Sequence, residues 1–264
     1  MSDPVRIERQ ATVATVVLSR PEARNAVDPA TAAALLESFL ALDRDPGIDA
    51  IVLWGAGGTF CAGADLRAVT AGWDTGRLRP PSGAPDDPYG PLGPTRLCLT
   101  KPVIAAVAGH AVAGGLELAL WCDLRIAEED AVFGVFCRRW GVPLIDGGTV
   151  RLPRLIGQSR AMDMILTGRA VGAAEAHAIG LANRLVPRGE ARSAAEALAR
   201  EIAAFPQGCL RADRRSAWAQ WSLPEADALR GEFVGGSEVL RSGEAAAGAA
   251  RFLGGAGRGG RFDQ

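Results

Sequence analysis

Two runs of apolar and β-branched residues open the chain, Val5–Arg9 and Thr12–Leu18, with a short turn between them. Runs of this kind are typical of strands, and their close spacing predicts a hairpin. A helical period follows, introduced by Asp28-Pro29, which can cap and start a helix, and stopped by Asp45-Pro46-Gly47. The apolar face of this helix is formed by Leu35, Leu36, Phe39, Leu40 and Leu42.

Two further units run from an apolar strand into a glycine-rich loop. Ile48–Trp54 ends in such a loop, and Lys101–Gly109 leads through a second one into the expected helix Gly114–Cys122. This repetition favours stacked ββα turns over a dinucleotide-binding sheet. The proline-rich stretch 72–94 between them predicts an irregular, mobile loop beside the site, or alternatively a tolerated surface insertion.

The second half of the chain is rich in helical patterns. From residue 158 to about 203 the pattern is mostly helical, with Val171 and Asn183–Val186 as short strand candidates. From Pro206 it is helical almost to the end, and the glycine-rich tail 254–260 is predicted to be flexible. The apolar residues of this C-terminal region could pack on its own core or on another subunit.

Composition narrows the class of protein. The 29 Lys and Arg balance the 30 Asp and Glu, so no overall charge points to nucleic acid or an anionic membrane as partner. No leader or membrane-length apolar stretch is visible, which makes a cytoplasmic location the default expectation. Five cysteines without a CxxC pair argue against a disulfide framework or a zinc site, and most are expected to be buried. They are Cys61, Cys98, Cys122, Cys137 and Cys209.

With two histidines in the chain, the candidate chemistry lies in carboxylates and backbone amides. Thr59–Leu66 and His110–Glu117 each place small residues after an apolar strand, where amides can approach a ligand. The Gly114 amide, at a helix N-terminus, is suited to an oxyanion and would form a hole with the Ala62 amide. The glycines could equally serve tight packing alone.

These segments resemble the crotonase (enoyl-CoA hydratase/isomerase) superfamily. The resemblance is carried by Phe60–Leu66, by Gly109–Ala119 and by the Cys122-Asp123 pair that follows. It extends to Arg20–Ala26, Gly147–Gly157 and Leu166–Arg169, and so covers nearly the whole chain.

The resemblance implies an α/β fold, a spiral of ββα turns over residues 1–200 with a helical trimerisation region over 201–264. It also implies an acyl-CoA thioester as substrate, assembly as a homotrimer or a hexamer, and no metal or redox cofactor. The enolate oxygen would be held by the amides of Ala62 and Gly114. The coenzyme A moiety would be bound by Ala23, Arg24, Ala62, Gly63, Ala64, Asp65, Leu66 and Gly114.

Glu117 falls where hydratases keep one of their two catalytic glutamates. A glutamate inside the apolar run 116–120 is costly to bury unless it is paired or used, which favours a functional role over an exposed helix carboxylate. The second glutamate position holds Cys137, a poor replacement for a carboxylate and most simply a packing residue. Asp146 is the alternative acid, unless it caps the helix that begins near Gly147.

Three functions remain open from the sequence. Hydration of a trans-2-enoyl-CoA by Glu117 and Asp146 is the leading hypothesis. Movement of a double bond by Glu117 alone is the second, and a non-catalytic acyl-CoA binding protein is the third. Arg138 and Arg139 are candidates for phosphate contacts or for ordinary surface roles, and His110 and His177 for structural roles.

Overall fold

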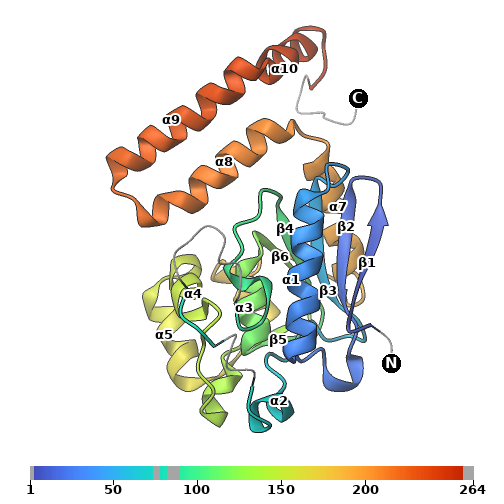
Figure 1. Ribbon diagram of the computed structural model, residues 1–264, viewed down its shortest axis with the longest axis vertical. Helices are drawn as coiled ribbons and strands as arrows, with labels where there is room; N and C mark the ends of the chain where they lie inside the picture. The colour runs from blue at the N-terminus through green and yellow to red at the C-terminus, as the bar shows by residue number, and fades with distance from the viewer. Residues whose placement is uncertain (1–2, 74–77, 82–89, 258–264) are drawn as a thin grey trace. The chain divides into compact units, whose positions relative to one another are not determined.

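The computed structural model describes residues 3–73, 78–81 and 90–257 of the chain. It divides into two compact units, residues 1–200 and residues 201–264. The first unit contains both sheets and the predicted site, and the second is helical (Figure 1). No helix within the described ranges is long and apolar enough to cross a membrane.

A six-stranded sheet, ordered β1-β2-β3-β4-β6-β9, forms the centre of the first unit. β1 (Val5–Gln10) and β2 (Val13–Leu18) pair antiparallel, which confirms the predicted hairpin. The remaining strands pair parallel: β3 (Ala50–Gly55), β4 (Val103–Val107), β6 (Leu124–Glu128) and β9 (Arg184–Val186). β2 and β4 are buried along their whole length, as continuous apolar strands of a covered parallel sheet should be.

The helix α1 (Pro29–Arg44) begins as the sequence predicts, because the Asp28 side chain accepts a 2.8 Å hydrogen bond from the Thr31 amide. Its buried face includes Leu35, Phe39 and Leu42, and the Phe39 ring meets the Trp121 ring edge-on at 4.8 Å. The apolar period therefore marked the correct face of this helix.

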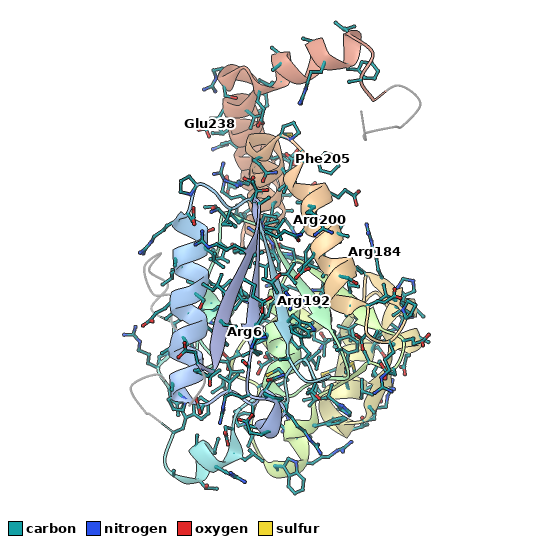
Figure 2. All side chains as sticks on the ribbon, turned by 90° about the vertical axis from the view of Figure 1, so that its right-hand side faces the viewer. Arg6, Arg184, Arg192, Arg200, Phe205 and Glu238 are labelled. Carbon is teal, nitrogen blue, oxygen red and sulfur yellow. The ribbon has the colours of Figure 1, made fainter. Side chains whose placement is uncertain are left out.

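The helix α7 (Ala191–Ala203) contacts the sheet through polar groups. Glu196 accepts a hydrogen bond from Thr15 of β2 at 2.8 Å. The guanidinium of Arg192, which is labelled in Figure 2, lies 4.9 Å from the Trp54 ring centroid. These contacts join α7 to β2 and β3.

A smaller sheet and the shorter helices complete the first unit. β5 (His110–Val112) and β7 (Val132–Gly134) pair parallel, and β8 (Ala170–Gly172) joins β7 antiparallel. The helices are α2 (Leu66–Thr70), α3 (Gly114–Trp121), α4 (Gly148–Ile156), α5 (Gln158–Thr167) and α6 (Ala173–Ala178). Short 3₁₀ turns are η1 (Pro21–Ala23), η2 (Pro94–Arg96) and η3 (Phe136–Trp140).

Arg125, on β6, is the largest fully buried side chain of the described residues. Its guanidinium donates to the carbonyl oxygens of Ala119 at 3.2 Å and Cys122 at 2.8 Å, at the C-terminal end of α3, and to Leu181 at 2.7 Å. A cation at this end satisfies carbonyl groups that the helix itself leaves unpaired. Arg125 therefore connects the C-terminal end of α3 to strand β6 of the sheet.

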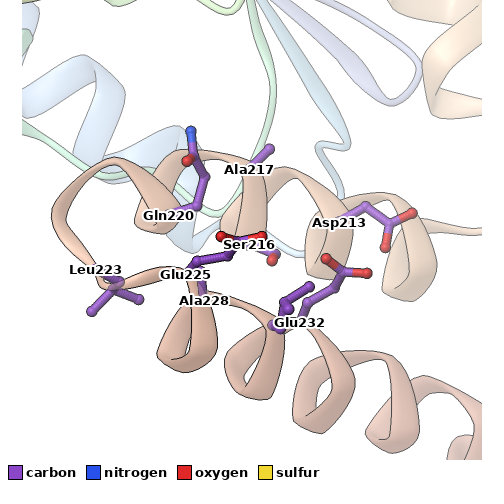
Figure 3. Close-up of a pocket in the computed structure, with 9 residues that line it drawn as sticks. Asp213, Ser216, Ala217, Gln220, Leu223, Glu225, Ala228 and Glu232 are labelled. Atoms are coloured by element: carbon purple, nitrogen blue, oxygen red, sulfur yellow. The ribbon is translucent and has the colours of Figure 1, made fainter.

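The second unit contains α8 (Gln207–Ala219), the 3₁₀ turn η4 (Gln220–Ser222), α9 (Glu225–Ser242) and α10 (Glu244–Leu253), which confirms the predicted helical C-terminus. An open groove between α8 and α9 is lined by Asp213, Leu223 and Glu232 among others (Figure 3). Several large apolar side chains of α9 are exposed, including Phe233 at 75%. Trimerisation through this region stays a prediction.

Two expectations fare differently. Three of the five cysteines, Cys61, Cys122 and Cys137, are buried, which confirms the expectation that most are; Cys98 and Cys209 are exposed. Most of the predicted irregular loop 72–94, and the end of the glycine-rich tail, lie outside the described residues.

Candidate active site

One pocket of about 480 Å³ in the first unit is lined by most of the predicted site residues. Its wall is mainly apolar and combines the loop after β3, α2, the start of α3, η3 and the segment that leads into α4. The polar side chains that line it are those of Arg24, Glu117, Cys137 and Asp146. The apolar side chains include Leu66, Val69, Trp73, Leu78, Leu92, Val112, Phe136, Trp140, Val142 and Ile145.

Glu117 lies in the first turn of α3 and is 2% exposed, so it is not an exposed helix carboxylate. Its Oε1 accepts hydrogen bonds from the amides of Asp146 and Gly148, both at 2.8 Å. Burial, and then the nearby Asp146 carboxylate, raise the pKa of Glu117 to about 8, against the opposing effect of these amides and of Arg151. The side chain is therefore protonated at neutral pH and can give a proton within the pocket.

Asp146 is 3% exposed and lines the same pocket. Its Oδ1 accepts from the Leu92 amide at 3.0 Å and from the Thr95 hydroxyl. Burial raises the pKa of Asp146, while the Thr95 and Leu92 hydrogen bonds and the Arg96 and Arg151 charges act against the rise. The expectation that Asp146 caps α4 is wrong, because α4 starts after Gly147 without a side-chain cap.

The oxyanion hole expected at Ala62 needs correction. The Ala62 amide already donates to the Arg24 carbonyl oxygen at 3.0 Å, so it has no hydrogen left for a ligand. The Ala64 amide has no acceptor among the described residues and lies 3.5 Å from the position that a Cβ on Gly114 would take. Ala64 and Gly114 both line the pocket, and neither amide has an acceptor among the described residues, so these two amides are the candidates for the oxyanion hole.

The predicted coenzyme A residues separate into two groups. Arg24 and Leu66 line the pocket with Ala62, Ala64 and Gly114. Ala23, Gly63 and Asp65 do not line it. Asp65 caps α2 through a 3.0 Å hydrogen bond from the Arg67 amide and pairs with Arg20 at 3.0 Å, while the Gly63 carbonyl accepts from Val27. Asp65 and Gly63 thus shape the loop.

Cys137 is buried in η3 and lines the pocket beside Glu117. Burial raises the pKa of the Cys137 thiol, and Glu117 raises it further when ionised, so the thiol stays protonated and does not replace a carboxylate. Arg138 and Arg139 are exposed, donate to the carbonyl oxygens of Ile165 and Gly168 at 3.1 and 2.7 Å, and do not line the pocket.

The two histidines also lie apart from the site. His110 and His177 are exposed and neither lines the pocket. No cluster of metal-ligating side chains occurs in the part of the chain that the structure describes. The residues that the sequence did not reveal are Leu92, Thr95 and Arg151, which hold Asp146 in place.

The raised pKa of Glu117 predicts a pH dependence of stability. The unfolded carboxyl ionises near 4.5 and the folded one near 8, so ionisation favours the unfolded chain between these values. Relative to Glu117→Gln, the free energy of unfolding of the wild type should fall as pH rises from about 4.5 to about 8, by on the order of 4 kcal/mol. Urea unfolding at fixed protein concentration measures it; parallel pH curves for the two proteins would contradict the assignment.

Comparison with known proteins identifies the family of the chain. The family model described as "Enoyl-CoA hydratase/isomerase" matches residues 8–253. The enoyl-CoA hydratase EchA19 of Mycobacterium tuberculosis is 37% identical over 253 residues, which cover 93% of this chain and 92% of that protein. A carnitinyl-CoA dehydratase of Salmonella arizonae is 38% identical over 207 residues, covering 76% of this chain and 75% of that one.

Solved structures are also similar. The crystal structure of enoyl-CoA hydratase EchA1 from Mycobacterium marinum has a TM-score of 0.88 and 34% identity, with 96% of both chains covered. These matches confirm the crotonase superfamily that the motifs suggested. The chain is an enzyme that belongs to the enoyl-CoA hydratase/isomerase family.

Proposed function

We propose that the protein adds water to a trans-2-enoyl-CoA, with Glu117 and Asp146 as the acid and the base. Asp146 takes a proton from water while the water oxygen bonds to C3 of the acyl group, and the double-bond electrons move to the thioester oxygen. Glu117 then gives its proton to C2, which restores the thioester carbonyl. The product is a 3-hydroxyacyl-CoA.

The observation that carries this proposal is the coupling of the two carboxyl groups. Both line one apolar pocket, and the Asp146 amide donates to Glu117 Oε1 at 2.8 Å. Burial raises the pKa of both groups, but hydrogen bonds from Thr95 and Leu92 oppose the rise at Asp146. Two carboxyl groups in unequal surroundings can differ in pKa and act as acid and base.

The enolate oxygen is proposed to bind between the amides of Ala64 and Gly114. Gly114 is the first residue of α3, where the helix presents unpaired N–H groups and a partial positive charge. The Leu92 side chain packs against Gly114, since a Cβ on Gly114 would come within 2.3 Å of Leu92 Cδ1. An amide pair covered by an apolar side chain stabilises negative charge better than one in water.

A second candidate reaction is the movement of a double bond between C3 and C2, because Asp146 is already bound by Leu92 and Thr95. Glu117 alone would remove a proton from one carbon and return it to the other. This reaction needs Glu117 in its ionised form when substrate binds, and it needs no base for water.

The reactions are separated by Asp146→Asn. The rate at which enoyl-thioester absorbance is lost should be about 10²-fold lower, or lower still, in this variant if Asp146 is the base. Isomerisation of a 3-enoyl-CoA should remain largely intact. Asp130→Asn, at an exposed position paired with Arg188, is the matched control. Wild-type hydration by Asp146→Asn would refute the proposed base. Thermal stabilisation by acyl-CoA without turnover of either substrate would leave a binding protein.

Two further proposals accompany this reaction. The mechanism uses proton transfer and amide hydrogen bonds, so we propose that it requires no metal or redox cofactor. The exposed apolar side chains of α9 and α10 support self-association, with a trimer or hexamer as the proposed assembly.

A further inference from the structure

The guanidinium of Arg151 is turned back over the start of its own helix, α4. It donates from Nη1 to the Asp146 carbonyl oxygen at 2.9 Å and from Nη2 to the Thr95 carbonyl oxygen at 2.7 Å. A Cβ on Gly147 would lie 2.2 Å from Nη1, so the guanidinium fills the space that a side chain there would need. One planar group thus joins η2 to the segment before α4.

The backbone of residues 146–148 lies between Arg151 and Glu117. The Asp146 carbonyl accepts from Arg151, while the amides of Asp146 and Gly148 both donate to Glu117 Oε1. The carbonyl bound by Arg151 belongs to the peptide group between residues 146 and 147. The amides that bind Glu117 belong to the peptide groups on either side of it. A rotation of this peptide would turn at least one amide away from Glu117.

Thr95 closes a ring of hydrogen bonds with Arg151 and Asp146. Its hydroxyl donates to Asp146 Oδ1, and its carbonyl oxygen accepts from Arg151. Thr95 is 1% exposed, so water does not compete with these bonds. Both carboxyl groups of the pocket are thus connected to one arginine that does not itself line the pocket.

The titratable groups around this ring come from several elements. Asp146 precedes α4, Cys137 lies in η3, Cys122 ends α3, and Arg96 and Cys98 belong to or follow η2. Burial lowers the pKa of Arg151, and the surrounding acidic groups oppose this change. The Arg151 charge in turn lowers the pKa of Glu117 and of Asp146.

We propose that Arg151 is a positioning residue, which holds the 146–148 backbone so that its amides orient Glu117 and keep Asp146 at the pocket. The consequence for catalysis rests on the proposed function. The effect of Arg151 on the orientation and the pKa of Glu117 does not rest on it, because both can be measured without substrate.

The test compares Arg151→Met and Arg151→Lys with the wild type by infrared titration of the Glu117 carboxyl, identified as the band lost in Glu117→Gln. Arg151→Met should raise the pKa of Glu117 by about one unit or more, since a cation and well-placed amides are lost. It should lower kcat for enoyl-CoA by about 10-fold or more at nearly constant KM. Arg151→Lys keeps the positive charge but loses the planar pair of N–H donors, and should have an intermediate kcat. Arg160→Met, at an exposed position of α5, is the control.

An unchanged Glu117 titration in folded Arg151→Met would overturn the proposal, whatever the enzyme assay gives. If Arg151→Met does not fold, Arg151→Lys decides: a lower kcat at unchanged KM supports positioning, and wild-type kcat refutes it. A wild type without turnover would refute the proposed function and leave the titration as the test of Arg151.

Discussion

Glu117→Gln is expected to abolish measurable turnover of enoyl-CoA, with kcat reduced by about 10³-fold or more, in the range that a positioned acid or base contributes. The glutamine keeps a carbonyl oxygen for the amides of Asp146 and Gly148, so the pocket should keep its shape. Its amide is too weak an acid to give a proton to C2. Steady-state kinetics with a trans-2-enoyl-CoA measure the loss, and thermal stabilisation by a saturated acyl-CoA measures the binding that remains.

The matched control is Glu128→Gln. Glu128 is also buried, at 6% exposure, and also accepts from a backbone amide, that of Ala191. It does not line the pocket. Its replacement should leave kcat near the wild-type value. Equal losses in both variants would mean that burial of a carboxyl matters to the fold and that Glu117 has no special part in the chemistry.

Arg125→Met is expected to cause the largest loss of stability, about 3–5 kcal/mol, because it removes a buried charged group whose partners then remain buried and unpaired. The carbonyl oxygens of Ala119 and Cys122 would lose their donor at the end of α3, and that of Leu181 would lose its donor as well. Denaturant unfolding at fixed protein concentration measures the change.

Arg184→Met, at an exposed position of the neighbouring strand β9 (Figure 2), is the control and should change stability by less than about 0.5 kcal/mol. A small effect of Arg125→Met, similar to that of the control, would show that the buried guanidinium contributes no net stability. Since α3 carries Glu117, we also expect the destabilised protein to lose activity at a lower temperature.

The strands and long helices could be predicted from the sequence because their signals are local. Asp28 and Pro29 start α1 through contacts within one turn, and the apolar runs of β2 and β4 are long enough to identify themselves. The burial of Glu117 also follows from a local pattern, since every neighbour in its helix is apolar or small. These features depend little on how distant segments meet.

The oxyanion hole shows where local patterns are insufficient. The motif 60–66 identified the correct loop, but the direction of each amide depends on the backbone angles and on distant partners. The Ala62 amide is taken by the carbonyl of Arg24, from a segment near the start of the chain, and this contact leaves Ala64 to face the pocket. Residue spacing contains no information on that pairing.

The surroundings of Asp146 could not be predicted for the same reason. Its partners Leu92 and Thr95 lie some fifty positions earlier, in a segment without a recognisable pattern. Arg151 looks like a surface residue of an amphipathic helix, and only the fold brings its guanidinium onto the Asp146 carbonyl. Asp146 does not cap α4 because the N-cap position is occupied by the next residue, Gly147, which has no side chain.

The packing of the 146–148 backbone between Arg151 and Glu117 also determines which positions tolerate substitution. Gly147 has a φ of 98°, and any side chain there would collide with the guanidinium; a Cβ on Gly148 would lie 3.0 Å from Glu117 Oε1. The next two residues, Thr149 and Val150, are exposed and carry no such restriction. In a mutagenesis library directed at new substrates, most substitutions at 147 and 148 should therefore be inactive, although neither glycine has a side chain that could react, whereas 149 and 150 can vary freely.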